Sequence, residues 1–411
     1  MFYNYTTLIF IYAVGNGLFI SSGSVLTIII PSIFVLYSSW INIKYSKYLS
    51  HNKIIYIYII YIAILVYFSS NIPYSLKNVL KSFVPLFYFG VAIAFVNNYK
   101  ALNRLFKSMI ILGILFIANL IISNLFNLGG SSYSADETDY LQTGSIYSEG
   151  LNSMGYYLIL LPAIIQLYPF KRQYEKRIVL LMCFAIFISL LLVLKRGSLL
   201  IVFSGYIILL LFSQFKQRKR LIKTLLFSAL ALVLSFPLYE KMLYERINVR
   251  QDRLQLDSYE SELRHTENEL VIKDIFYSGN KVWLFFGHEV LNSAGNYGGG
   301  VYRERQLHND YAQLLNGSGI IGLSLYFLMN ISILTYYLKL RKKILCAGLY
   351  GKKERLLNMV FWAFFLVYFI LGFSGSIDSL IYNPIRFIFL GAIIGIFKNI
   401  ACHVNLIKLA D

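Results

Sequence analysis

The sequence predicts an all-α polytopic membrane protein. Hydrophobic residues make up 57% of the 411 positions, charged residues make up only 14%, and the mean hydropathy is +0.61. A soluble domain of this length does not normally combine such values. The apolar residues also come in runs long enough to cross a bilayer as helices, with short polar or basic stretches between them. We therefore expect a single integral membrane domain over residues 1–411.

A helix needs about 20 mainly apolar residues to cross the hydrocarbon core of a membrane. About twelve segments fit this requirement, namely 5–21, 24–41, 54–70, 79–96, 105–127, 151–169, 177–194, 197–213, 221–238, 309–338, 356–373 and 384–400.

The basic residues set the expected orientation. The net charge is +18, and the Lys and Arg side chains occur in short clusters between apolar runs rather than on one folded face, which argues against a nucleic-acid partner. With the N-terminus in the cytoplasm, most of the 38 basic residues lie in inner loops, against only Glu175, Glu354 and Asp411 of the 20 acidic residues. The positive-inside rule therefore predicts both termini on the cytoplasmic side.

Two segments are predicted to lie outside the membrane. Residues 128–150 are rich in Gly, Ser and acidic residues and form the smaller extracytoplasmic loop. Residues 239–308 form a large loop between the ninth and tenth spans. Its first half carries an imperfect helical stripe, which predicts one or two helices lying over the bundle. Its second half is punctuated by glycines and leads flexibly into His308.

Two basic pairs lie on the predicted outer side. Lys195 and Arg196 stand between the seventh and eighth spans, where the positive-inside rule disfavours cations. Binding of a lipid-linked phosphate would explain them, and so would anchoring at the membrane rim. Arg264 and His265 lie on the predicted loop helix, where a solvated charged face is the alternative to a functional role.

The stretch from Arg303 to Leu328 organises the rest of the chain. It changes from charged to apolar, which places His308 where water meets lipid. Asn309 or Asp310 is expected to cap the following helix, because the side-chain oxygen can accept from backbone N–H groups of the first turn. The positive end of that helix favours an anion such as a pyrophosphate. A polar helix start at a membrane rim is the alternative.

At these positions the chain resembles the O-antigen polymerase and O-antigen ligase superfamily of bacterial membrane glycosyltransferases. The resemblance rests on KRGSLL at 195–200, on HNDYAQLLNGSGIIGL at 308–323 with the large loop directly before it, and on NPIRFIFLGAIIG at 383–395. These motifs cover roughly the C-terminal half of the chain, while the first 150 residues match only as a series of spans.

The resemblance implies a glycosyltransferase with a GT-C-like fold that needs no metal ion and no cofactor. It further implies an enzyme of the bacterial inner membrane that acts in the biosynthesis of lipopolysaccharide or a related polysaccharide. Its donor and acceptor would be polyprenyl-pyrophosphate-linked glycans, and a chain-length regulator is a possible partner. His308 matches the family's catalytic His and would act as general base. Residues expected at the diphosphate are Arg196, Lys195, Arg264 and Arg305, with weaker contacts from Arg303, Asn309 and Arg386, the last being an interface charge at the outer start of the final span.

Several alternatives stay open. His265 and His288 are rival bases, although no helix start is predicted beside either of them. A polymerase and a ligase differ in the acceptor, which is another lipid-linked unit or the lipopolysaccharide core. We favour the polymerase for its long loop and its 34 Tyr and 32 Phe residues, whose faces suit sugar stacking. A lipid-linked glycan flippase is disfavoured, because transporters usually place ionisable or broken-helix sites near the membrane midplane, whereas the interiors of these spans are nearly free of charge. A structural scaffold would leave Lys195, Arg196 and His308 without a role.

Overall fold

A computed structural model of the chain describes residues 53–126, 150–193, 196–215, 266–293, 295–300, 307, 309–373 and 384–407, with scattered positions at 36, 40 and between 217 and 248. The described residues are helical and contain no strand. Two compact units divide the chain: unit 1 holds Met1–Thr27, Asn98–Gln255 and Gly351–Val367, and unit 2 holds Ile28–Asn97, Leu256–Tyr350 and Tyr368–Asp411.

Except for α11, which the sequence did not predict, the helices overlap the predicted apolar runs. Their bounds are α3 Lys53–Tyr67, α4 Ile72–Phe95, α5 Tyr99–Leu125, α6 Gly150–Leu167, α7 Gln173–Val193, α8 Arg196–Leu211, α11 Lys281–Phe286, α12 Asp310–Cys346, α13 Lys352–Leu371 and α15 Pro384–Ile407. A π-helical turn at Lys273–Tyr277 and a 3-10 turn at Gly298–Gly300 lie in the predicted outer loop.

Five helices of the described part are long and apolar enough to cross a membrane, which makes the chain a helical membrane protein. They are Ile72–Phe95, Tyr99–Ile122, Asp310–Cys346, Lys352–Leu371 and Ile385–His403. Shorter apolar helices occur at Lys53–Tyr67, Met154–Leu167 and Leu199–Leu211. The predicted first two spans and the 128–150 loop lie outside the continuously described residues.

Unit 1 is built from α5 to α8 and most of α13. Helix α6 packs against α5, α7 and α8. Aromatic rings hold α13 in place, because Tyr156 stacks on Phe364 at 5.4 Å and Phe212 stacks on Trp362 at 4.7 Å between ring centroids. At the polar end of this unit, the Tyr99 hydroxyl donates to Glu354 over 2.5 Å.

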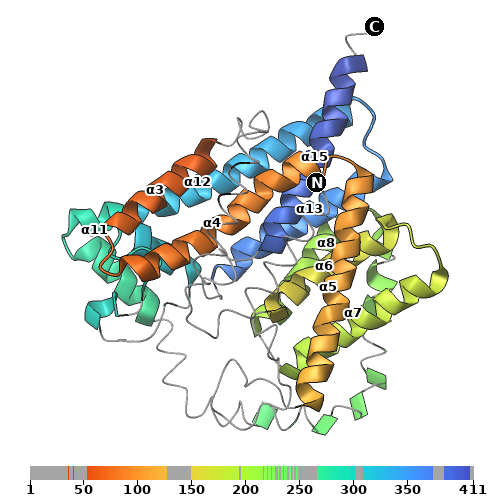
Figure 1. Cartoon of the computed structure of the whole chain (residues 1–411), viewed down its shortest axis with the longest axis horizontal. Coiled ribbons are helices and arrows are strands. Elements are labelled where there is room, and N and C mark those ends of the chain that lie inside the picture. The colour runs from red at the N-terminus through yellow and green to blue at the C-terminus, as the bar shows by residue number, and fades with distance from the viewer. Residues whose placement is uncertain are drawn as a thin grey trace. The chain divides into compact units, whose positions relative to one another are not determined.

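Unit 2 contains α3, α4, α11, α12, the last turn of α13 and α15, and it carries the predicted catalytic stretch. Helices α3, α4 and α12 run alongside one another, and α11 lies at one end of this group (Figure 1). Helix α15 packs closely along α4: a Cβ at Gly391 would lie 2.4 Å from the Phe89 carbonyl oxygen, and one at Gly395 would lie 2.7 Å from that of Val96. Small residues are what allow membrane helices to approach this closely.

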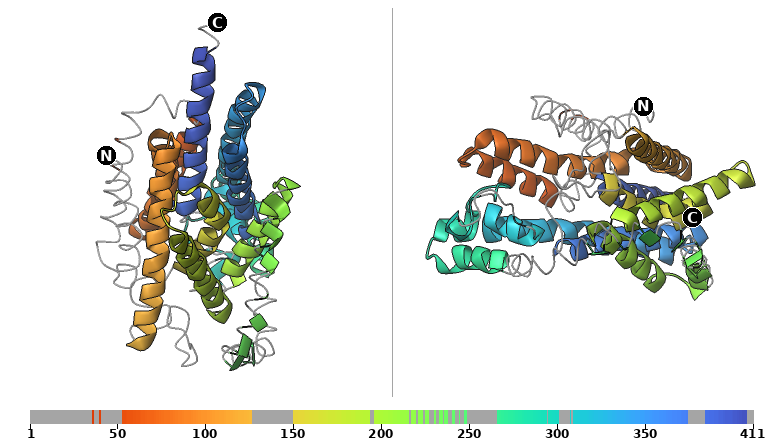
Figure 2. Two further views of the ribbon diagram at one scale, coloured as in Figure 1. Left: turned by 90° about the vertical axis from the view of Figure 1, so that its right-hand side faces the viewer. Right: turned by 90° about the horizontal axis from the view of Figure 1, so that it is seen from below.

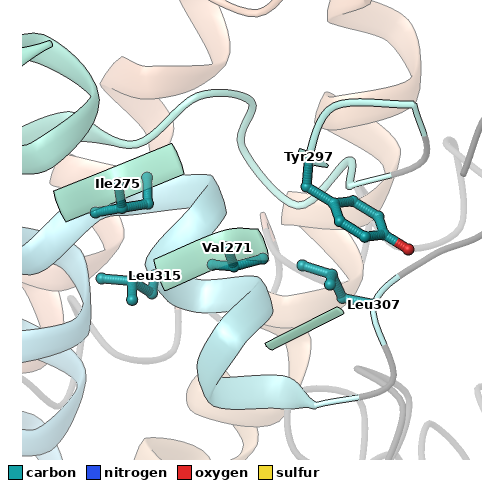
Figure 3. Packing of buried hydrophobic residues seen from close by; sticks show 5 residues of the cluster. All are labelled: Val271, Ile275, Tyr297, Leu307 and Leu315. Atoms are coloured by element: carbon teal, nitrogen blue, oxygen red, sulfur yellow. The ribbon is translucent and has the colours of Figure 1, made fainter. Parts of the chain in front are cut away.

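The described part of the 239–308 loop packs on α12. Helical residues 266–277 place Val271 and Ile275 over Leu315 of α12, and Tyr297 and Leu307 complete this buried cluster (Figure 3). Figure 2 shows the loop helices against α12 and beside the α3–α4 pair. The glycines that punctuate this loop do adopt positive φ angles, at Gly279, Gly287, Gly295 and Gly298–Gly300.

Candidate functional site

Helix α12 is broken at Gly319. Its φ of 62° and ψ of −168° are non-helical and are accessible essentially only to glycine. We call residues 310–318 the first arm of α12 and residues 320–346 the second arm. The sequence predicts a span over 309–338 without a break, and the break at Gly319 corrects this prediction. The only local signal for a break in this apolar run is the Gly-Ser-Gly at 317–319.

The two arms fold back on each other. In a continuous helix, the sixteen steps from Tyr311 to Phe327 would span about 24 Å. The rings of these residues are instead stacked with centroids 5.5 Å apart. The start of the first arm therefore lies beside the middle of the second arm, while Gly319 lies at the turn between them.

Backbone contacts fix the turn in place. A Cβ at Gly319 would lie 2.4 Å from the carbonyl carbon of Phe285, and a Cβ at Gly287 would lie 2.5 Å from the Ser318 nitrogen. The His288 N–H donates to the Asn316 carbonyl oxygen over 2.6 Å. The Tyr61 hydroxyl of α3 donates to the Ser318 carbonyl oxygen over 2.7 Å. Carbonyls freed by the break thus find partners within the protein, as a membrane helix requires.

The residues on either side of His308 are held by specific bonds. The Leu307 N–H donates to the Ser293 hydroxyl over 3.0 Å. The Asn309 side chain accepts from the N–H groups of Tyr311 and Ala312 at 2.9 and 3.2 Å, which confirms Asn309 as the predicted N-cap. The Asp310 N–H donates to the Gly372 carbonyl oxygen over 3.1 Å. His308 itself lies outside the described residues.

A buried charged cluster adjoins the start of the first arm. The Arg386 guanidinium carbon lies 3.0 Å from the Tyr368 ring centroid and 4.7 Å from that of Phe387, and its Nη2 donates to Asn330 Oδ1 over 3.2 Å. Asp310 and Arg386 both act electrostatically on Tyr368 and Tyr311. We call this group the Arg386 cluster, with the members Asp310, Tyr311, Tyr326, Asn330, Tyr368 and Arg386.

Burial is nearly complete in the Arg386 cluster. Arg386, Asp310 and Asn330 are 0% exposed, and the two tyrosines at 326 and 368 are 2% and 1% exposed. The sequence predicts Arg386 as an interface charge and predicts nearly charge-free span interiors. Arg386 stands in the first turn of α15, as the sequence predicts, and Asp310 stands in the first turn of α12. The sequence does not predict that other protein groups surround both side chains.

Two further polar side chains lie inside the first arm. Gln313 and Asn316 are each 1% exposed, and within the described residues neither carboxamide has a hydrogen-bond partner. Burying such groups in a membrane protein is costly unless they are satisfied. With Asp310 they form a polar stripe at a spacing of three residues along the first arm.

Of the other predicted site residues, the structure describes Arg196 and His288. Arg196 begins α8 as predicted, while Lys195, Arg264, His265, Arg303 and Arg305 lie outside the described residues. His288, a rival base, is exposed, and its ring lies 4.5 Å from that of Trp283.

Sequence reasoning missed Asp310, Gln313, Asn316, Asn330 and Tyr368 as members of the site. The spacing of the first three along an otherwise apolar helix was the available signal. Asn330 and Tyr368 carried no such signal, because only the fold-back of α12 and the docking of α13 bring them to Asp310.

A comparison with protein-family models finds no match to this chain, and a comparison with curated proteins likewise finds none.

Proposed function

We propose that the chain is a membrane glycosyltransferase that joins polyprenyl-pyrophosphate-linked oligosaccharide units into O-antigen or a related surface polysaccharide. The proposal adopts a GT-C-like arrangement of about twelve spans with the large loop on the outer face of the inner membrane. The observation that supports it most is the start of the first arm. Hydrogen bonds hold Leu307 and Asn309, the neighbours of His308, and the next residue, Asp310, belongs to the buried Arg386 cluster.

The chemistry of the residues supports the proposed reaction. A diphosphate leaving group gains negative charge as the glycosidic bond breaks, and Arg side chains and a helix N-terminus stabilise such charge without a metal. We propose that Arg196, Arg264 and Arg305 donate hydrogen bonds to the diphosphate. His308 is the proposed base that takes the proton from the attacking sugar hydroxyl, because a neutral imidazole has a pKa near the working pH.

The polar stripe of the first arm supports a sugar substrate. The carboxamides of Gln313 and Asn316 each offer a donor and an acceptor, which is the combination that sugar hydroxyl groups need, but at 1% exposure they reach a sugar only after the first arm moves. Arg386 is already engaged by Tyr368 and Asn330, so we assign it a positioning role for the first arm rather than direct contact with diphosphate.

A transporter of lipid-linked glycans is the second candidate. It gains support from the structure, since broken helices with buried ionisable residues are typical of transporter binding sites. The break at Gly319 and the buried pair Asp310 and Arg386 are features of that kind. An O-antigen ligase shares the proposed chemistry and differs only in its acceptor.

The surface glycan of a strain lacking this protein distinguishes these functions. We expect loss of the polymer ladder with a single unit retained on the core, and restoration by the wild-type chain. Bare core together with lipid-linked polymer would instead establish a ligase. Loss of both products would point to export.

A test with purified protein separates catalysis from transport. The full chain is reconstituted in vesicles with a polyprenyl-pyrophosphate-linked repeat unit, and its products are separated by length. We expect chains longer than one unit from the wild type and none from His308→Gln. Movement of the unit across the bilayer without any longer product would overturn the enzymatic proposal in favour of transport.

A further inference from the structure

The loop segment before α12 carries a row of exposed apolar side chains. Its members are Ile272, Phe276, Tyr277, Val282, Phe285 and Phe286, which are 46%, 49%, 79%, 62%, 44% and 46% exposed. We call them the 272–286 surface. The opposite face of the same segment is packed: Val271 and Ile275 are 0% and 1% exposed in the cluster on Leu315. The segment therefore has two apolar faces, and only one of them is used inside the protein.

The 272–286 surface continues into the outward face of α3 and the α3–α4 turn. The Tyr61 hydroxyl donates to the Phe285 carbonyl oxygen over 3.2 Å, and Glu289 accepts from the Ser70 N–H at 3.0 Å. Next to these bonds, exposed apolar side chains of α3 and α4 include Ile64 at 54%, Tyr67 at 78%, Phe68 at 74% and Ile72 at 46%. These residues belong to apolar helices of a membrane protein, so lipid is the solvent expected for their exposed faces.

The charges of the segment favour one kind of lipid. Lys273 and Lys281 are exposed beside the apolar residues. Two nearby carboxylates are engaged, since Asp274 accepts from the Gly298 N–H and Glu289 is only 5% exposed, while Glu269, four residues before Lys273, is exposed. Aromatic and aliphatic side chains with lysines at their edge form the pattern of elements that lie in the membrane interface, where lysines attract anionic headgroups.

We propose that the 272–286 surface lies in the boundary between headgroups and acyl chains of the leaflet at this end of unit 2, with its lysines on anionic phospholipids. Its backbone is locked to the α12 turn through Gly287 and Gly319, so this contact holds the turn at a fixed depth. The first arm, and with it the backbone that leads to Asn309, then starts from a position set by the membrane. The proposal rests on the membrane character of the chain and is independent of the proposed reaction.

Depth-dependent fluorescence quenching tests this placement in the full-length chain. The native cysteines Cys183, Cys346 and Cys402 are replaced, and single cysteines at Tyr277, Val282 or Phe286 carry an environment-sensitive NBD label. The matched control is Glu269→Cys, an exposed polar position on the same helical stretch. Vesicles of phosphatidylcholine, with or without phosphatidylglycerol, contain lipid with a doxyl quencher close to the headgroup. Monodisperse elution before reconstitution verifies that each variant folds.

We expect blue-shifted emission and loss of most fluorescence to the quencher at 277, 282 and 286, while the label at 269 stays water-like and largely unquenched. Lys273→Gln with Lys281→Gln should abolish the extra quenching that phosphatidylglycerol produces. Water-like, unquenched labels at all four positions would overturn the proposal. Blue-shifted labels that lipid does not quench would also overturn it, because another part of this chain or a second copy then covers the surface. Extra quenching by phosphatidylglycerol that persists in the double Lys variant would overturn the role of anionic lipid.

Discussion

The Arg386 guanidinium is tolerated inside the helices because two kinds of partner replace water. The Tyr368 ring presents its negative face to the guanidinium at 3.0 Å, and the Asn330 carboxamide oxygen accepts one N–H. A planar guanidinium can stack flat on the ring and still donate within its own plane, whereas an ammonium has no plane to stack. Since Asn330 and Tyr368 stand on different helices, Arg386 ties the second arm of α12 to the end of α13.

Replacing Arg386 should therefore destabilise unit 2. We expect Arg386→Ala to lower the free energy of unfolding by about 2–5 kcal/mol, because a large buried side chain and a hydrogen bond are lost. Arg386→Lys should recover only part of this loss. Thermal unfolding of the purified protein in detergent measures both. Tyr368→Phe is the control, since it keeps the ring face and should cost less; a larger cost for Tyr368→Phe than for Arg386→Ala would contradict this account.

The proposed role of His308 as a general base is tested by replacing it with Gln, a polar side chain of similar size that cannot act as a base. We expect His308→Gln and His308→Ala to reach the membrane at normal levels and to lose about 10²-fold or more in polymer formation, as expected on removing a general base. His265→Gln and His288→Gln are the controls and should keep most activity. An active His308→Gln with an inactive His265→Gln would place the base on the loop helix instead.

Arg196 is tested by a substitution that preserves charge. If Arg196 binds the donor diphosphate, Arg196→Lys should lose most polymer formation, because a point charge does not replace a bidentate fork. The amount of protein in the membrane, measured in parallel, should stay normal. Wild-type activity in Arg196→Ala would show that the side chain serves only as an anchor at the membrane rim.

At the scale of elements, the broken α12 is what assembles the site. A straight helix of 37 residues would carry Tyr311 far from Phe327, and Asp310 far from Tyr326 and Tyr368. The fold-back instead gathers polar groups of the first arm, the second arm, α13 and α15 in one buried place. Its turn depends on backbones that approach so closely that no side chain fits between them.

Gly319→Ala should disrupt this turn. The substitution adds backbone strain of about 1–3 kcal/mol at a non-helical, positive φ and drives a Cβ into the Phe285 backbone. We expect a lower unfolding temperature and faster proteolysis of the segment around residue 290. Gly299→Ala is a matched control: its φ is also positive at 65°, but nothing lies within 4 Å of the added Cβ. Equal effects of the two variants would show that strain alone matters, and not the close approach.

At the scale of the whole molecule, the distribution of charge sets the topology we expect. The basic clusters that carry most of the net charge of +18 alternate with acid-rich or apolar connections along the chain. From the same alternation we expect the 239–308 loop, the first arm and Arg196 on one side of the membrane. Every proposed role depends on that common side.

Accessible tags measure this topology. In intact spheroplasts, a tag inserted at residue 135 or 290 should be reached from outside, and a tag at 218 or 345 should be reached only after permeabilisation. The two inner positions serve as controls for membrane integrity. Protection of the tag at residue 290 would remove the loop from the outer face, and the proposed site along with it.

The sequence by itself determined that this chain is a helical membrane protein, because apolar runs of bilayer length persist whatever the tertiary arrangement. It also predicted the long described helices, with ends that differ from the structure by up to eight residues. It left the cap of α12 between Asn309 and Asp310, and the structure confirms Asn309. The break at Gly319 was decided by tertiary structure, where Phe285 and Tyr61 supply partners for the interrupted backbone. The burial of Arg386 was also decided by tertiary structure, because the partners that make a buried charge tolerable come from segments distant in sequence. Asn330, for example, lies 56 residues away, and a local sequence pattern does not predict such a contact.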